Sequence, residues 1–251
     1  MMYHPTLDKL QQLKLTGMLR ALQEQEAIAD IRTMPFEERL GLMVDRELTD
    51  RDNRRMQTRL RAAKLKQNTA LEDIDFKSAR GLDRSLIMKL AACEWVAEHL
   101  NVLLTGATGV GKTFLACALA HKACREGYSS YYVRLSRLFQ DLDIGRADGR
   151  YAKMMRQMGK TDVLVMDDWG LAVLSDQHRR DLLEILDDRY NLRATVITSQ
   201  LPIAHWHEAV GDPTLADAIL DRVVHNAYKI NLSGSSMRKE REKLTTDRPT
   251  P

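Results

Sequence analysis

Apolar residues in the first part of the chain recur at the spacing of an α-helix. One set, at positions i, i+3, i+4 and i+7, consists of Leu15, Met18, Leu19 and Leu22. A second set follows Pro35, which suits the first turn of a helix, and consists of Phe36, Leu40, Met43, Val44 and Leu48. The β-branched alternation of a strand does not occur in this part of the sequence. We therefore expect residues 1–66 to form a small all-helical N-terminal domain.

The remaining sequence alternates short apolar runs with helical patterns. The runs that predict strands are Val102–Leu104, Ser130–Val133, Val163–Met166, Thr195–Thr198 and Tyr228–Ile230. A helical pattern from Ser175, a good N-cap residue, to Tyr190 separates two of them. Short apolar strands separated by helices are typical of a mostly parallel sheet that is covered on both faces. The sequence thus predicts an α/β domain with a five-stranded parallel sheet over residues 67–240, and a polar, disordered tail at 241–251.

The composition fits a soluble protein with enough apolar surface for a core. Of the 251 residues, 44% are hydrophobic and 29% are charged, and the formal net charge is only +3. No stretch approaches the ~18 apolar residues that a membrane span needs, and the start of the chain lacks the apolar stretch of a signal peptide. Cys93, Cys117 and Cys124 lie in helical patterns without zinc-ligand spacing, so we expect reduced, buried thiols. These observations predict a cytoplasmic protein without a membrane partner.

A phosphate-binding loop is the most specific motif in the sequence. Gly106-Ala107-Thr108-Gly109-Val110-Gly111-Lys112-Thr113 satisfies the pattern G-x-x-x-x-G-K-[ST], and it lies between a predicted strand and a predicted helix. Glycines let backbone N–H groups converge on phosphate oxygens, and the helix N-terminus adds its positive dipole end. We expect Lys112 to reach the β- and γ-phosphates and the Thr113 hydroxyl to ligate a magnesium ion. The motif therefore predicts ATP and Mg²⁺ as cofactors.

Two adjacent carboxylates form the second candidate element. Asp167 and Asp168 directly follow the apolar run Val163–Met166. Ligands of open α/β sheets bind at the carboxyl ends of the strands, where these side chains emerge. We expect Asp167 to hold Mg²⁺, mostly through water, and Asp168 to polarise the water that attacks ATP.

Two later segments carry further candidate catalytic residues. Ser199 and Gln200 follow a predicted strand; they suit either a role at the attacking water and the γ-phosphate or plain hydrogen bonding at a strand end. Arg222 lies late in a helix that Pro213 begins, beside Asp221. It is either an ion-paired surface residue or an arginine finger that reaches the γ-phosphate bound by a neighbouring subunit. The residues alone leave both alternatives open.

Between residues 51 and 66 the predicted helix becomes strongly basic. Seven cationic side chains stand against one acid, Asp52; they are Arg51, Arg54, Arg55, Arg59, Arg61, Lys64 and Lys66. This segment is the candidate DNA-binding surface outside the ATPase core, and the alternative is a solvated helix face. No aromatic residue is interleaved, so we expect phosphate contacts and little sequence preference.

These segments together closely resemble the IstB family of insertion-sequence helper ATPases. That family is a branch of the AAA+ superfamily related to the DnaC helicase loaders. The resemblance covers almost the whole chain and rests on Phe36–Leu40, Leu71–Phe76, Gly81–Asp83, Asn101–Gly106, Asp167–Leu171, Ile197–Pro202, Gly211–Asp221 and His225–Ala227.

The resemblance implies an AAA+ core without a C-terminal lid domain. It also implies an ATPase that forms a homo-oligomer on double-stranded DNA, partners the transposase of the same element and helps to select the target. By matching position, Arg222 looks like the arginine finger acting in trans, and Gln200 like the sensor residue, with Ser199 as the alternative. Arg238 falls in a segment that matches a terminal family motif, in which Ser235 stands where the family usually has an acid.

Two other functions use all or some of these motifs. A helicase-loading adaptor would share the ATPase and differ in its partner. A small-molecule kinase would share only the phosphate loop; it would need a substrate lid and no arginine from a neighbour.

Overall fold

The chain contains two compact units. The computed structural model describes residues 5–28, 30–76 and 80–237, and it divides after Thr58 into Met1–Thr58 and Arg59–Pro251. The domain limits expected from the sequence, 1–66, 67–240 and 241–251, put the boundary at the end of the basic segment and remain a prediction. The expected tail lies outside the described residues.

The first unit is helical, as the sequence predicts. It holds α1 (Pro5–Gln12), α2 (Thr16–Glu26), the short 3-10 turn η1 (Ile31–Thr33) and most of α3 (Phe36–Ala63). Helices α2 and α3 approach closely at Gly17, where a Cβ atom would lie 2.6 Å from the Glu47 Cα. The Glu47 carboxylate accepts hydrogen bonds from the backbone N–H of Gly17, at 2.7 Å, and of Met18, at 3.3 Å. A side chain of α3 thereby caps the first turn of α2.

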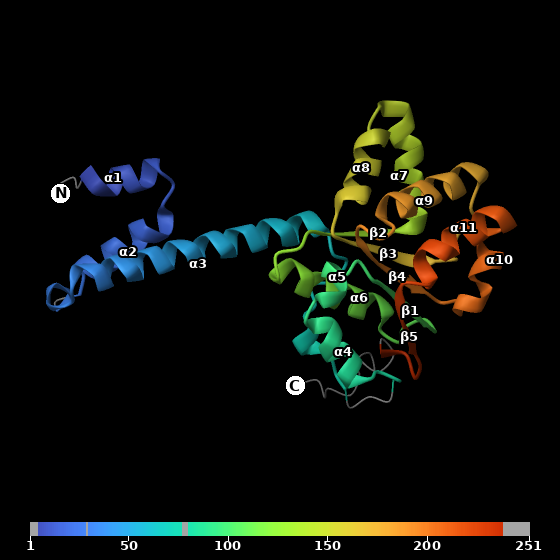
Figure 1. The fold of residues 1–251 in the computed structure, drawn as a ribbon, viewed down its shortest axis with the longest axis horizontal. Helices are drawn as coiled ribbons and strands as arrows, with labels where there is room; N and C mark the ends of the chain where they lie inside the picture. Colours follow the sequence, from blue (N-terminus) through green and yellow to red (C-terminus); the bar gives the residue numbers. More distant parts are fainter. Residues whose placement is uncertain (1–4, 29, 77–79, 238–251) are drawn as a thin grey trace, which may run out of the picture. The chain divides into compact units, whose positions relative to one another are not determined.

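The second unit is built on a five-stranded parallel sheet (Figure 1). Its strands are β1 (Asn101–Gly106), β2 (Ser130–Arg134), β3 (Val163–Trp169), β4 (Ala194–Ser199) and β5 (Ala227–Leu232). The spatial order is β2-β3-β4-β1-β5, and every neighbouring pair is parallel. All five strands expected from the sequence are confirmed, each extended by one to three residues in total. The α/β architecture with a parallel sheet is likewise confirmed.

Helices cover both faces of the sheet, because successive strand residues point to opposite sides. Val102 and Leu104 pack in one apolar cluster with α4 (Arg84–Ala91), α5 (Glu94–Ala97) and α6 (Lys112–Arg125). Leu103 packs in the other cluster, with five helices on the opposite face (Figure 1). These helices are α7 (Leu135–Asp148), α8 (Tyr151–Lys160), α9 (Asp176–Arg189), α10 (Trp206–Val210) and α11 (Pro213–Val224). Two 3-10 turns, η2 (Leu71–Asp73) and η3 (Ile203–His205), complete the elements.

Two helices start at the residues that the sequence predicts. Ser175 caps α9 by accepting a hydrogen bond from the His178 N–H, and Pro213 is the first residue of α11. All three cysteines are buried and free, as expected. After β5 the described chain continues only through residues 233–237, so no lid domain follows within it. In the described part of the chain, no helix is long and apolar enough to cross a membrane.

Candidate functional site

The loop between β1 and α6 has the backbone geometry that phosphate binding demands. Gly106, Gly109 and Gly111 have φ angles of +138°, +89° and +106°, which glycine adopts without the strain that a side chain would cause. At Gly106 there is also no room for a side chain, because a Cβ atom would lie 2.1 Å from the Leu232 carbonyl oxygen. Val110 is fully buried and anchors the loop. The loop therefore offers backbone N–H groups at the start of a fourteen-residue helix, a favourable place for an anion.

Lys112 lies under this loop. Its side-chain ammonium donates hydrogen bonds to the carbonyl oxygens of Gly106, at 2.6 Å, and Ala107, at 2.7 Å. The residue is only 7% exposed, so the ammonium is held at the floor of the site. An ammonium held here can donate to phosphate oxygens cradled by the loop.

Asp167, at the end of β3, is completely buried and has partners on both carboxylate oxygens. Oδ1 accepts from the hydroxyls of Thr113, at 2.9 Å, and Thr198, at 2.6 Å. Oδ2 accepts from the Tyr132 hydroxyl and lies 3.4 Å from the Lys66 ammonium. Burial alone would raise the pKa of Asp167, but the hydrogen bonds and the lysine outweigh it, so the pKa lies below its ordinary value. The carboxylate is thus kept ionised.

The donor set at this carboxylate fits a magnesium ion that arrives with a nucleotide. Mg²⁺ prefers oxygen ligands and retains several waters, so one carboxylate and one hydroxyl suffice when phosphates supply the rest. Asp167 and Thr113 provide these two groups. Among the described residues, no cluster of three or more His, Cys, Asp or Glu could hold a metal ion by itself. The ion is therefore expected to depend on the nucleotide.

Asp168 reaches the site through a bulge in β3. The pairing of β3 with β4 shifts register between Met166 and Trp169, and Asp168 has a φ of +66°. Bulges re-aim side chains next to functional sites. Here the bulge turns Asp168 into the same cavity that Lys112 and Thr113 line. Its carboxylate forms a 2.9 Å ion pair with Arg134, the last residue of β2.

The structure separates the two candidate sensor residues. Gln200 lines the cavity, and its side-chain oxygen accepts a 2.7 Å hydrogen bond from Thr108 of the phosphate loop. Ser199 is fully buried; its hydroxyl donates to the Trp169 carbonyl oxygen at 2.9 Å and accepts from the Leu201 N–H at 3.0 Å. The geometry favours Gln200 as the residue that faces a ligand, with Ser199 as its structural support.

Lys112, Thr113, Asp168 and Gln200 line one cavity of about 350 Å³, within the range usual for ligand pockets. Sequence reasoning missed two cations there, Arg134 and Arg80. Arg80 is 6% exposed, and its guanidinium donates to the Asp75 carbonyl oxygen. The guanidinium lies next to the phosphate loop, 3.3 Å from where a Cβ atom on Gly111 would stand. Arg134 could have been found, because it directly follows the predicted strand Ser130–Val133, at the carboxyl end where ligands bind. Arg80 carries no comparable sequence signal.

Arg222 stands apart from the residues that line this cavity. It lies on α11, where its guanidinium donates to Asp187 Oδ1 at 2.7 Å and to the Ala218 carbonyl oxygen at 2.7 Å. Its side chain is 26% exposed. Both alternatives from the sequence, a surface ion pair and a finger acting on another subunit, are compatible with this placement. Arg238 lies outside the described residues.

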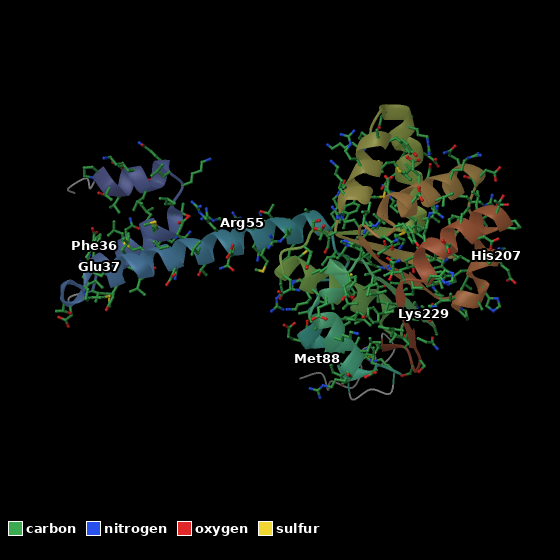
Figure 2. The ribbon with its side chains drawn as sticks, in the orientation of Figure 1. Phe36, Glu37, Arg55, Met88, His207 and Lys229 are labelled. Atoms are coloured by element: carbon green, nitrogen blue, oxygen red, sulfur yellow. The ribbon has the colours of Figure 1, made fainter. Side chains whose placement is uncertain are left out.

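The basic segment is less uniform than its sequence suggests. In the first unit, Arg51 and Arg54 lie 2.7 and 3.5 Å from the Glu47 carboxylate, and the exposed Arg55 lies on α3 (Figure 2). In the second unit, Arg59 donates to the Cys124 carbonyl oxygen at the end of α6, a common way to cap a helix.

Arg61 is exposed, and the Lys64 ammonium lies 5.6 Å from the centre of the Tyr131 ring. Lys66 lines the cavity described above and contacts Asp167. A role in DNA contact stays a prediction for the whole set, and the structure gives Arg59 and Lys66 other partners.

Comparison with known proteins agrees with the geometry. The profile of the family described as "IstB-like ATP binding protein" matches residues 8–245. A putative insertion sequence ATP-binding protein of Sinorhizobium fredii is 51% identical over 243 residues, covering 97% of this chain and 99% of that protein. The insertion sequence IS1162 putative ATP-binding protein of Pseudomonas fluorescens is 50% identical over 203 residues, covering 80% of this chain and 88% of that protein.

Solved structures with the same fold include DnaI and the DnaC helicase loader. The crystal structure of DnaI superposes with a TM-score of 0.57 at 26% identity, covering 66% of this chain and 92% of that chain. The DnaC helicase loader superposes with a TM-score of 0.56 at 24% identity, covering 68% of this chain and 100% of that chain. The second likeness concerns the fold alone.

Proposed function

Because the chain belongs to the family of IstB-like ATP-binding proteins, an AAA+ family, we propose that it is a Mg²⁺-dependent ATPase that works in insertion-sequence transposition. It binds and hydrolyses ATP, assembles as a homo-oligomer on double-stranded DNA, and assists the transposase encoded by the same element in using its target. The names of the relatives from Sinorhizobium fredii and Pseudomonas fluorescens support the insertion-sequence context.

One observation carries the catalytic part of the proposal. Lys112, Thr113 and Asp168 line a single cavity, and the buried Asp167 lies hydrogen-bonded to Thr113 at its edge. Lys112 and the loop N–H groups bind the phosphates. Thr113 and Asp167 would hold Mg²⁺, and the ion would supply positive charge to the transferred phosphoryl group. Asp168 accepts the proton of the attacking water, and Gln200 orients that water.

The assembly part of the proposal rests on where Arg222 lies. Among the described residues, the cations that line the cavity are Lys66, Arg80, Lys112 and Arg134, whereas Arg222 lies on α11 and pairs with Asp187. An arginine that stabilises the charge of the transition state in trans makes hydrolysis depend on neighbours. Assembly of subunits on DNA would then stimulate ATP hydrolysis.

A reconstituted integration reaction tests the proposal. The protein, the transposase from the adjacent reading frame, a donor end and a target duplex are combined with ATP and Mg²⁺, and integration products are counted. We expect products to depend on the protein and on ATP, and the duplex to stimulate ATP hydrolysis. Integration that proceeds equally without the protein would remove the transposition role.

The second candidate is a helicase-loading adaptor, and the crystal structure of DnaI, at 26% identity, has the same fold. The same protein is mixed with the replicative helicase of its host, and helicase loading onto single-stranded DNA is measured. We expect no loading, because identity to the insertion-sequence relatives reaches 51% over nearly the whole chain, against 26% over two thirds of it for DnaI. Loading without an effect on integration would reverse the assignment.

A further inference from the structure

Lys66 faces the buried carboxylate of the nucleotide site. It follows the last residue of α3, Ala63, by three positions, and its ammonium lies 3.4 Å from Asp167 Oδ2. The Lys66 side chain is 30% exposed, whereas the Asp167 side chain is completely buried. The lysine therefore reaches inward to the carboxylate from a solvent-accessible segment.

This contact supplies the charge that the other partners of Asp167 do not. Thr113, Thr198 and Tyr132 donate from neutral hydroxyls. A buried carboxylate without a compensating cation is costly, so a nearby ammonium stabilises the protein when no metal ion is present. Lys112 is the other nearby candidate, but two of its hydrogen bonds go to the loop carbonyls of Gly106 and Ala107.

We propose that Lys66 is the internal counter-ion of Asp167 in the nucleotide-free protein and that it competes with the magnesium ion for this carboxylate. This inference rests on the magnesium site of the proposed function. A divalent ion held near Asp167 would supply the positive charge that this carboxylate needs. The Lys66 ammonium is then redundant and is repelled by the ion, so it must withdraw from the carboxylate. Lys66 thus sets how much Mg²⁺ the site requires.

The first test measures the Mg²⁺ dependence of nucleotide binding in the full chain. A fluorescent ATP analogue is titrated at a series of Mg²⁺ concentrations, and in EDTA, with wild type and Lys66→Met. We expect the half-saturating Mg²⁺ concentration to fall about two- to fivefold in the variant, the size typical of one partly exposed ion pair. Binding in EDTA should be unchanged. Lys122→Met is the matched control, because Lys122 pairs with Glu126 away from the cavity.

A double-mutant cycle tests the ion pair without any ligand. Thermal unfolding is followed in EDTA for wild type, Lys66→Met, Asp167→Asn and the double variant. We expect Lys66→Met to lower the melting temperature when Asp167 is present, and to lose that effect in the Asp167→Asn background. Equal effects in both backgrounds would mean that Lys66 stabilises the fold without pairing to Asp167.

The outcomes separate this inference from the proposed function. Weaker binding of the analogue by Lys66→Met in EDTA would overturn competition, since it would make Lys66 a phosphate ligand. An unchanged Mg²⁺ requirement in Lys66→Met, with a normal response in wild type, would also overturn it and leave the ATPase proposal standing. Only a wild type that binds the nucleotide without any Mg²⁺ dependence would count against the magnesium site itself.

Discussion

The hydroxyl of Thr113 donates a 2.9 Å hydrogen bond to Asp167 Oδ1, and this contact joins the first turn of α6 to the end of β3. Strands β1 and β3 are not neighbours, because β4 lies between them, and Thr198 from β4 donates to the same oxygen at 2.6 Å. The carboxylate is therefore fixed by three elements before a ligand binds. A site that is already ordered loses little conformational entropy on binding.

Loss of the loop cation should prevent nucleotide binding. Lys112→Ala removes the positive charge beneath the phosphate loop, and we expect affinity for a fluorescent ATP analogue to fall about a hundredfold or more, beyond detection. Lys122→Ala, on the same helix but away from the cavity, is the control and should bind normally. Near-normal affinity of a folded Lys112→Ala would contradict the assignment of the loop.

Neutralising the second carboxylate should separate binding from hydrolysis. Asp168→Asn leaves Lys112, Thr113 and Asp167 intact, so ATP should bind normally while hydrolysis falls about 10²–10⁴-fold. The change also removes the ion pair with Arg134, so Asp148→Asn is the matched control, since Asp148 pairs with Arg150 outside the cavity. Unchanged turnover of Asp168→Asn would mean that Asp168 has no role in ATP hydrolysis.

The stability of the helical unit should depend on the negative charge of Glu47. Burial alone would raise the pKa of Glu47, but hydrogen bonds from Arg51, Gly17 and Met18 outweigh it and place the pKa below the ordinary value of 4.5. A carboxyl whose pKa is lower in the folded state stabilises that state above its unfolded pKa, and this stabilisation disappears as the pH falls through the folded pKa.

We therefore expect Glu47→Gln to destabilise the unit by about 1 kcal/mol near neutral pH, because a charged acceptor becomes a neutral one. The difference from wild type should vanish as the pH falls below 4.5 and through the lowered pKa. Hydrogen exchange at the Gly17 and Met18 amides in the full chain measures it. A difference that persists in acid would mean that the amide disturbs packing and that charge is not the cause.

If the basic segment contacts DNA phosphates, replacing its residues should weaken the salt dependence of DNA binding. Arg55, Arg61 and Lys64 are exposed, and each can be replaced without releasing the Glu47 carboxylate or the Cys124 carbonyl. If all three contact phosphates, changing them to Gln should lower the slope of log K against log salt by about 2.7.

The control for that experiment is a second basic surface. Lys153, Arg156 and Lys160 are exposed on α8 at positions i, i+3 and i+7, so they share one helix face. Changing these three to Gln should leave the slope unaltered. If only the α8 variant lowers the slope, the DNA-binding surface lies on the ATPase core and not on the basic segment.

Patterns local in the sequence predicted most of the fold and the glycine-rich turn after β1. Apolar runs identified all five strands, and the glycine spacing identified the loop, since both depend on neighbouring residues. The contacts between distant segments were not predictable. The bulge that re-aims Asp168 depends on how β3 pairs with β4, and the inward reach of Lys66 depends on the path after α3. A run of basic residues indicates charge, but it cannot show which of its members face solvent.

We expect Arg222 to make ATP hydrolysis depend on a neighbouring subunit. Arg222→Ala should bind ATP nearly as wild type, because the loop and Lys112 are intact. We expect hydrolysis to fall about 10³–10⁵-fold, as for the loss of an arginine finger, together with ATP-dependent assembly on DNA. Asp187→Asn is the matched control, since it breaks the same ion pair while it keeps the arginine. If the pair matters only for the fold, both variants should behave alike.

A mixing experiment makes the prediction specific to neighbouring subunits. Arg222→Ala and Lys112→Ala are each inactive alone for different reasons. In a mixed assembly, some interfaces pair the intact loop of an Arg222→Ala subunit with the intact arginine of a Lys112→Ala subunit, so part of the ATPase activity should return. A kinase-like enzyme that acts as a monomer has no such interface and would show no rescue. Absence of rescue, with co-assembly shown by cross-linking, would make Arg222 an ordinary surface residue paired with Asp187.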